Sequence, residues 1–578
     1  SGTAIVLATG ATVSDMIEIV VYDVFSVADT VSKSAGGTFD GNVVMAGTVS
    51  VTGTSTLTGN VAASGNLTVS GDIIKSTAGT SNFAAGVNAG NSIASGGNYN
   101  TVVGDEAGTA LTTGDGVVAI GFEALKTEDA NGTTTAIGYQ ALKVQNAGAE
   151  SNNTAVGYQA GLATNTGVYN TFIGSLAGTA NTTGQNTFIG GQAGQGNTDG
   201  TNNLGIGVNA LQANTTGDFA VGIGHFALQN QNVTNGAATY NTAVGYSAGN
   251  DVTTGTLNTL VGGLSGDALT TAGSCTAIGH EALSTSQDGA GNTALGYRAL
   301  YDMTSGARNV GLGEQGGRGI TTGNDNIGAG TQSFYAACTG SANIGLGYRS
   351  FFSATSAASN VGVGYQSLTD LNSGTENVAV GHRALPHVTT GDSNIGIGIS
   401  TGDGLRGTAL TTGASNILIG RQVDVAAADN SYSGVIGVHI TGKGSSTGFF
   451  SFNDGAIYQG NNNANWTTTS DIRIKKNIVD SNIGLEELKK IQVRNFEYRT
   501  KDEITEVPSH AAINKQGVQV GVIAQEIQAV LPDTVKEEST GVLSVNPDNL
   551  TWHLVKAIQE LSAKNDELEA RIKKLEES

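Results

Sequence analysis

Residues 467–478, with the sequence TTTSDIRIKKNI, place a serine and a lysine five positions apart, with an aspartate and an arginine between them. A serine hydroxyl is a weak nucleophile at neutral pH, and a lysine amine can take its proton only when that amine is uncharged. A nearby arginine and a second lysine, together with burial, would favour the uncharged amine. The segment therefore could support nucleophilic chemistry, with Ser470 as the nucleophile and Lys475 as the base. The alternative is that it is only a polar entrance to a strand.

This segment opens the last fifth of the chain, where the composition changes. More than half of the 27 Lys and Arg residues lie in residues 470–578, as do three of the 4 prolines. Residues 1–469 are rich in glycine and poor in charge by comparison. The change predicts a compact domain of ordinary composition at 470–578, behind a repetitive body.

The body is an array of short repeats. Segments such as NTAVGYQAG and NTFIGSLAG recur, and their central glycines, from Gly104 to Gly437, are mostly 17 residues apart. Val, Ile or Leu precedes almost every one of these glycines, and Asn lies four residues before most of them. Units so rich in Gly, Thr and Asn favour a strand with tight turns, and they bury an apolar column only by stacking. We predict a parallel β-solenoid of about twenty repeats at 81–445, with the aliphatic column pointing inward and the Asn column forming an amide ladder.

Three steps in the array are longer than the others, at 138–157, 224–245 and 398–420. A layer of fixed size must expel the extra residues, so we expect bulges or protruding loops and no helix inside the core. Ahead of the array, glycines that recur every six residues predict a β-helical shaft at 35–80, and alternating apolar residues predict a small β-module at 1–34. Residues 446–469 are interpreted as a neck.

The residue after the repeat glycine is often aromatic. Six of these rings are those of Tyr139, Tyr158, Tyr246, Tyr297, Tyr348 and Tyr365. Such a column could stack on the sugar rings of a host glycan, but packing between chains is the favoured interpretation. Histidines hold the same place in well-separated layers, so we expect no metal site, and no cofactor is indicated.

Composition excludes several classes of protein. With 86 glycines but only 4 prolines the chain is not collagen, and 13% charged residues are too few for a long coiled coil. A net charge of −21 argues against binding to nucleic acid. No apolar run is long enough for membrane insertion, and two cysteines cannot form a disulfide framework or a four-ligand zinc site. The chain starts at Ser1 without a signal-like segment, and we expect a processed chain or a fragment.

Two resemblances concern the body. The six-residue period resembles the interwound β-helical shafts of viral fibres, in which three chains share one core. The repeats resemble the β-roll heads of trimeric autotransporter adhesins, which also carry an Asn, an aliphatic–Gly pair and a small residue. Together they imply a mainly β, trimeric parallel β-solenoid fibre.

A third resemblance concerns residues 470–578. TTTSDIRIKKNI, RNFEYR, GVIAQEIQAVLPDTV and a helical end resemble the C-terminal intramolecular chaperone of endosialidases and other phage tail spikes and fibres. Members of that family trimerise, guide the folding of the preceding fibre, and usually release themselves by autoproteolysis directly before the motif serine. The resemblance implies a cut between Thr469 and Ser470, with Ser470 as nucleophile and Lys475 as its basic partner. Asp471 and Arg473 fill the remaining places of the motif.

The chain is predicted to end in a short coiled coil at about 550–578. Its seam alternates steps of four and three through Leu554, Ile558, Leu561, Asn565, Leu568, Ile572 and Leu575. Ile and one Asn at the a positions with Leu at d favour a coiled coil of two helices, whereas the family resemblance implies a coiled coil of three helices. We follow the family resemblance and expect three helices. His553 on this helix is expected to be an interface or surface residue, not a ligand.

These observations predict a structural and receptor-binding tail fibre of a tailed bacteriophage, exposed on the virion. A small α+β chaperone domain follows its β-solenoid. The expected partners are two further copies of the chain, other tail proteins and a host cell-surface glycan or protein, with no nucleic acid. The enzymatic activity, if there is one, is Ser–Lys self-cleavage.

Two alternatives stay open. A glycan depolymerase tailspike needs paired carboxylates at a defined separation, but the body offers only scattered acids such as Asp105, Glu123, Glu281 and Glu314. A bacterial surface adhesin is weakened because the C-terminal membrane anchor usual for that class is absent.

Overall fold

The computed structural model describes residues 78–130, 132–148, 150–452, 455–459, 466–467, 470–507, 513, 515–538 and 541–578. The chain divides into two units, residues 1–240 and residues 241–578. The β-module predicted at 1–34 and nearly all of the shaft predicted at 35–80 lie outside the described residues.

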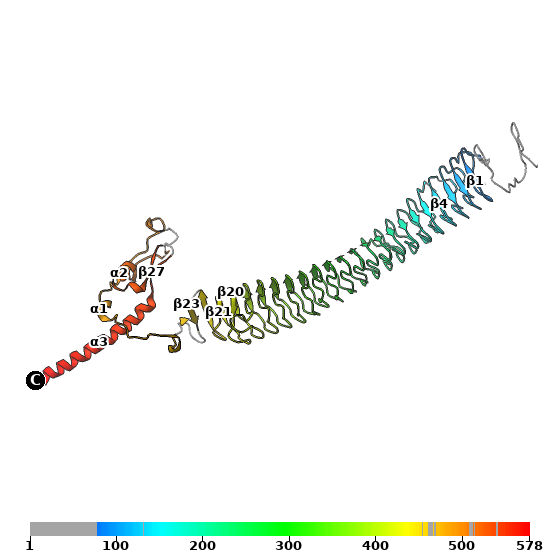
Figure 1. Cartoon of the computed structure of the whole chain (residues 1–578). Helices are drawn as coiled ribbons and strands as arrows, with labels where there is room; N and C mark the ends of the chain where they lie inside the picture. The colour runs from blue at the N-terminus through cyan, green and yellow to red at the C-terminus, as the bar shows by residue number, and fades with distance from the viewer. Residues whose placement is uncertain are drawn as a thin grey trace, which may run out of the picture. The chain divides into compact units, whose positions relative to one another are not determined.

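The first unit is a stack of β-coils, each of which contributes one three-residue strand (Figure 1). Each strand pairs in parallel with the next, and equivalent residues lie opposite each other, as Thr154 does with Thr171 and Val156 with Ile173. The strands are β1 (Phe83–Ala85), β2 (Thr101–Val103), β3 (Val118–Ile120), β4 (Thr135–Ile137), β5 (Thr154–Val156), β6 (Thr171–Ile173), β7 (Thr187–Ile189), β8 (Leu204–Ile206) and β9 (Val221–Ile223). The coil of β1 precedes the first predicted repeat.

The second unit begins with coils of the same kind, which confirms the predicted β-solenoid with repeats of about 17 residues. The short strands are β10 (Thr242–Val244), β11 (Thr259–Val261), β12 (Thr276–Ile278), β13 (Thr293–Leu295), β14 (Val310–Leu312), β15 (Ile327–Ala329), β16 (Ile344–Leu346), β17 (Val361–Val363), β18 (Val378–Val380) and β19 (Ile395–Ile397). Longer strands follow, β20 (Ile417–Asp424), β21 (Gly434–Thr441) and β22 (Gly448–Phe452), and these pair in parallel. The strands β23 (Gly455–Gln459) and β24 (Trp466–Thr467) then pair in antiparallel fashion.

A glycine ends each short strand, and the geometry there requires it. Gly157 has φ +141°, a conformation that L side chains rarely adopt. A Cβ atom at Gly157 would also lie 2.4 Å from the carbonyl oxygen of Gly174 in the next coil. The glycine column is therefore a condition of stacking the coils so closely.

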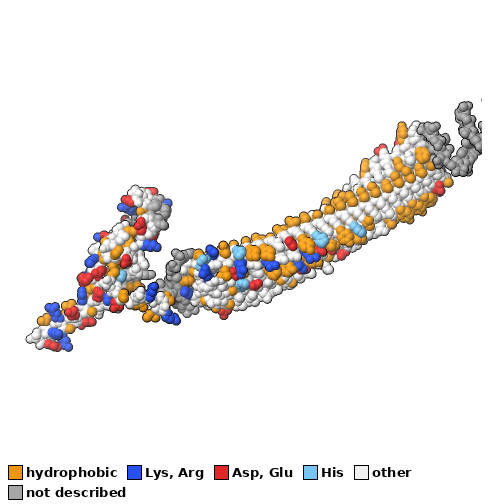
Figure 2. Space-filling view, in the orientation of Figure 1, with side chains coloured by type: hydrophobic (Ala, Val, Ile, Leu, Met, Phe, Trp, Pro, Cys, Tyr) orange, Lys and Arg blue, Asp and Glu red, His pale blue; other side chains and the backbone are white. Residues whose placement is uncertain are grey.

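The prediction that the aliphatic column points inward is wrong. In β5 the middle residue, Ala155, is fully buried, whereas Thr154 and Val156 are partly exposed. Successive side chains of a strand point to opposite faces, so a three-residue strand sends only its middle residue into the coil. The aliphatic residues form an outward row, in which Ile173 is 38% exposed and Leu295 48%. Figure 2 shows hydrophobic side chains in rows along the coils.

Two of the buried positions of each coil compete for the same space. They are the middle residue of the strand and the residue six places later. Phe172 is followed in this way by Gly178, whereas Ala136 is followed by Leu142, and the three side chains larger than glycine are fully buried. A Cβ atom at Gly178 would lie 2.4 Å from the Phe172 ring. Because protein interiors are close-packed, a large residue at one position excludes a large residue at the other.

The asparagine column forms the predicted amide ladder. Asn377 is fully buried, and its Oδ1 accepts a hydrogen bond of 2.9 Å from the backbone N–H of Asn394 in the next coil. Its Nδ2 donates to the carbonyl oxygen of Gly391 at 2.8 Å. The ladder thus satisfies buried backbone groups that the short strands leave without partners.

The described residues of the three longer steps form irregular loops, and none of them lies in a helix, as expected. The largest, between Gly398 and Gly420, is tied down by Asp424, which is fully buried. Its carboxylate accepts hydrogen bonds from the backbone N–H groups of Gly404 at 2.9 Å and Gly407 at 3.1 Å. The extra residues leave the core of the coil intact.

Residues 470–578 fold into short α and β elements and one long helix. The elements are η1 (Ile472–Ile474), α1 (Leu485–Leu488), β25 (Arg494–Phe496), β26 (Gln519–Gly521), α2 (Ala524–Val530), η3 (Pro532–Thr534), β27 (Val535–Glu537), β28 (Leu543–Val545) and α3 (Pro547–Glu576). The pairs β25–β26 and β27–β28 are antiparallel. Helix α3 covers the predicted coiled coil and begins at Pro547, a residue that suits the first turn of a helix because it lacks the N–H group.

Candidate functional site

The turn of η1 brings Lys475 back to Ser470. The Nζ atom of Lys475 donates a hydrogen bond of 2.6 Å to the Ser470 hydroxyl oxygen. The backbone N–H groups of Ile474 and Lys475 bond to the carbonyls of Asp471 and Ile472, both at 3.2 Å. A fully extended chain would carry residues five positions apart to a separation of roughly 16 Å. The turn is therefore what makes the contact possible.

Asp471 and Arg473 hold this turn. The Asp471 carboxylate accepts a hydrogen bond of 2.8 Å from the backbone N–H of Arg473 and one of 2.6 Å from its guanidinium group. The guanidinium, followed by that N–H, lowers the pKa of Asp471, and the same ion pair raises the pKa of Arg473. The structure therefore brings all four predicted residues together, two in contact with each other and two beside them as supports.

The site is open in the single chain. Ser470 and Lys475 are exposed, and the neighbouring Ile472 and Ile474 are 72% and 69% exposed. The single chain therefore does not supply the burial that would favour a neutral Lys475 amine, and Arg473 is paired with Asp471. Lysine is the donor in the observed hydrogen bond, whereas catalysis needs a neutral amine that accepts the serine proton. Thr469, the other side of the expected cut, lies outside the described residues.

The match to known families begins at this serine. Residues 470–536 match the family model described as chaperone of endosialidase. This confirms the predicted endosialidase-type chaperone segment. A β-solenoid followed by such a chaperone segment fits a phage tail fibre or tailspike protein.

A curated relative is similar to this chain over a short stretch only. Myelin regulatory factor homolog 1 of Caenorhabditis elegans is 32% identical over 105 residues, which make up 18% of this chain and 11% of that protein. The chain therefore spans about a tenth of that relative's length. The likeness does not extend over the β-solenoid and the chaperone segment together.

The aromatic residues expected to face a glycan lie on the surface of the solenoid but cover one another. Phe122, Tyr139 and Tyr158 stack in successive coils, with ring centroids 5.3 and 5.4 Å apart. Tyr348 and Tyr365 stack in the same way at 5.3 Å. Because each ring faces its neighbour, these columns offer mainly ring edges and hydroxyl groups to a sugar.

The other two candidate tyrosines are also outward. Tyr246 is 55% exposed and Tyr297 42%. Tyr297 stacks with His280 at 6.0 Å and has the Arg298 guanidinium 5.1 Å from its ring centroid. The six tyrosines thus lie along the coils and do not converge on one site.

The sequence analysis missed a second outward column, five residues after the repeat glycine. The Arg318 guanidinium lies 5.0 Å from the centre of the Tyr335 ring and 5.8 Å from that of Tyr301. Tyr335 in turn stacks with Phe352 at 5.0 Å. Comparing the fifth position of each aligned repeat would have shown this mixed column.

The acids that a depolymerase would require are occupied in salt bridges or scattered. Glu123 pairs with Lys126 and Lys143, both at 2.7 Å, and Glu281 pairs with Arg298. Across the described residues there is no cluster of three or more His, Cys, Asp or Glu side chains that could hold a metal ion. In that same part of the chain, no helix has the length and apolar character needed to cross a membrane.

Proposed function

We propose that the chain is a tail-fibre protein whose C-terminal domain assembles it as a homotrimer and then cuts the Thr469–Ser470 bond. The observation that carries this proposal is the 2.6 Å contact between Lys475 and Ser470, at the residue where the chaperone segment begins. A serine and a basic group within hydrogen-bond distance are the first requirement for nucleophilic catalysis of this kind.

The proposed reaction uses the carbonyl group that precedes the serine. A neutral Lys475 amine accepts the Ser470 hydroxyl proton while the oxygen attacks the carbonyl carbon of Thr469. The peptide C–N bond breaks, the proton passes to the departing Ser470 nitrogen, and an ester remains between Thr469 and the Ser470 oxygen. Water then hydrolyses the ester, which leaves a carboxylate on Thr469. Asp471 and Arg473 act as positioning residues because they fix the turn.

We assign receptor binding to the solenoid body, whose outward rows would meet a host glycan or protein at the virion surface. The rings stack between successive coils of one chain, which supports a packing role within the solenoid, and their edges and hydroxyl groups stay available for contacts to a glycan or to another chain. The depolymerase alternative is less favoured because Glu123 and Glu281 are engaged by lysine and arginine side chains.

Denaturing intact-mass measurement of the purified full chain tests the cleavage. We expect a body that ends at Thr469 and a fragment that begins at Ser470, whereas Ser470→Ala should give one mass of full length. Ser481→Ala, a matched removal of a hydroxyl in the same segment, should be cut like the wild type. A wild-type trimer that stays uncut would contradict the self-cleavage and leave the fibre assignment standing.

A further inference from the structure

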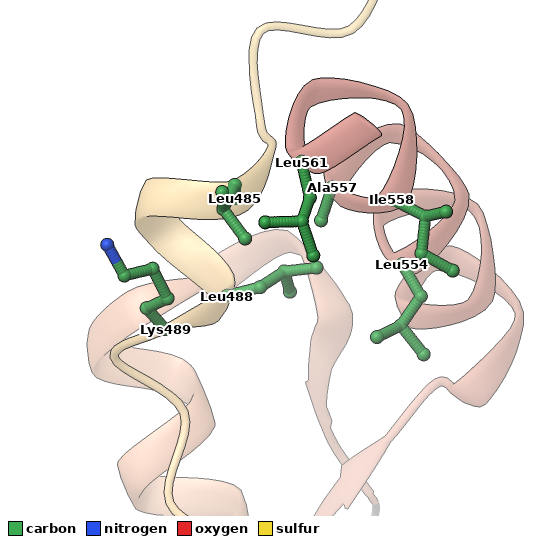
Figure 3. A pocket seen from close by; sticks show the side chains of 7 residues that line it. All are labelled: Leu485, Leu488, Lys489, Leu554, Ala557, Ile558 and Leu561. Atoms are coloured by element: carbon green, nitrogen blue, oxygen red, sulfur yellow. The ribbon is translucent and has the colours of Figure 1, made fainter. Parts of the chain in front are cut away.

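Helices α1 and α3 enclose an apolar groove. Its volume is about 260 Å³, and its lining consists of Leu485, Leu488, Lys489, Leu554, Ala557, Ile558 and Leu561. Figure 3 shows Leu485, Leu488 and Leu561 pointing into the same space. The groove is therefore shared between both helices.

Helix α1 is fixed along one flank of α3. The backbone N–H of Leu485 donates to the Glu560 carboxylate at 2.8 Å. Lys564 forms an ion pair with Glu486 at 3.1 Å. These contacts define the position of α1 beside α3 and keep the groove open on its other side.

The groove continues the predicted coiled-coil seam. Leu554, Ile558 and Leu561 are the first three seam residues, and they also line the groove. They are 50%, 64% and 55% exposed, and the later seam residues Leu568 and Ile572 are 54% and 53% exposed. One apolar surface therefore runs from α1 along the length of α3.

We propose that α3 of a second copy of this chain fills the groove, in parallel orientation, so that α1 is part of the subunit interface. This inference rests on the proposed homotrimer. In the seam register, Lys564 and Arg571 hold g positions, whereas Glu569 and Glu576 hold e positions. A parallel pair places Arg571 opposite Glu576 of the partner subunit, whereas Lys564 is already paired with Glu486 of its own chain. An antiparallel pair would oppose like charges.

The groove also accounts for the number of subunits. Taken without α1, a seam with Ile at a, Leu at d and a single Asn favours a coiled coil of two helices. Leu485 and Leu488 widen the apolar face beyond that narrow seam, and a wider apolar stripe needs more than one neighbouring helix to cover it. Helix α1 thus favours three chains over two.

The first test compares Leu488→Glu with the control Lys490→Gln, an equal change of charge at an exposed residue beyond the groove. Both are made in the full chain carrying Ser470→Ala, and subunit dissociation is followed by light scattering over a dilution series. We expect Leu488→Glu to raise the dissociation concentration at least roughly tenfold, and Lys490→Gln to leave it unchanged. A trimer unaffected by Leu488→Glu would overturn the inference, whereas a monomeric parent protein would overturn the proposed homotrimer itself.

The second test does not depend on weakening the assembly. Chains with Leu488→Cys and differently tagged chains with Ile558→Cys are co-expressed and treated with a short bismaleimide. The native Cys275 and Cys338 are buried. We expect crosslinks between the two tags, and crosslinks confined to pairs of Ile558→Cys chains would contradict the seating of α3 beside α1.

Discussion

Lys475 and Arg473 carry the same charge in one short turn, but their chemistry differs. Lysine can lose its proton when its surroundings favour the neutral amine, whereas arginine stays charged in proteins. The proposed cut requires a neutral amine that accepts the Ser470 proton. A residue that only supplies positive charge and hydrogen bonds at this place would therefore not support cleavage.

Replacing Lys475 by Arg should therefore stop the cleavage while preserving the positive charge and the trimer. The measurement is the fraction of full-length chain in intact-mass spectra after a fixed incubation. Lys476→Arg, the same change one residue later, should be cut normally. Normal cleavage by Lys475→Arg would remove lysine from the mechanism.

Glu123 supplies a pH-dependent contribution to the stability of the body. Hydrogen bonds from Lys126, then from Lys143 and Gln140, lower its pKa from 4.5 to about 2. A carboxylate whose pKa is lower in the folded state stabilises the fold above pH 4.5 and loses that effect as the pH falls toward about 2.

Glu123→Gln should therefore lower the thermal midpoint at pH 7, and the difference from the wild type should vanish near pH 2. Thermal unfolding followed by circular dichroism at several pH values is the measurement. Glu150→Gln, at an exposed carboxylate, serves as control and should change little at either pH. An equal loss of stability at both pH values would show that packing, not charge, is responsible.

Two buried positions of each coil of the solenoid compete for the same space. Gly178→Leu should be strongly destabilising because its Cβ would already lie 2.4 Å from the Phe172 ring. Phe172→Ala should cost about 3–5 kcal/mol through the cavity it leaves. The double variant recreates the Ala136 and Leu142 arrangement of the coil of β4, two coils earlier, in which Leu142 has φ +47°.

We therefore expect the double variant to be more stable than either single variant, as measured by denaturant unfolding in a double-mutant cycle. Destabilisations that simply add would refute the shared-volume account.

The outcome of the sequence analysis follows from what a repeat pattern contains. The glycine and asparagine columns were predicted correctly because backbone geometry and backbone hydrogen bonds dictate both residue types at fixed places. The inward direction of the aliphatic column was wrong because a 17-residue period fixes equivalence between coils but not the face to which a residue points. In β8 the buried middle residue is Gly205, flanked by the outward Leu204 and Ile206, so hydrophobicity pointed to the wrong face.

The candidate site was likewise predicted only in part. The motif predicted that Ser470 and Lys475 act together, and the contact between them depends on one local turn. Burial around Lys475 could not be read from the sequence, because it depends on surfaces far away in the chain or on other subunits.

At the scale of the whole molecule, assembly is the property on which the proposal depends. Uncut Ser470→Ala protein should have a mass in solution of three times 58.1 kDa by light scattering. Ile572→Glu places a charge in the seam, beyond the groove, and should shift the protein toward smaller species. Ala570→Glu, on the opposite side of α3, should leave the mass unchanged. A stable monomer in the unaltered chain would contradict both the threefold assembly and the carry-over from the chaperone family.

The loop between Gly398 and Gly420 leaves the coil at one point and returns to it without altering the strands on either side, β19 and β20, which pair in parallel. Asp424 holds the exposed turn of this loop through the backbone of Gly404 and Gly407, so the turn has a defined shape at the surface. A substitution of the side chain alone is therefore suited to labelling: a cysteine in place of Leu405, which is 55% exposed, would present a coupled dye or tag at a fixed point of the surface without a redesign of the interior.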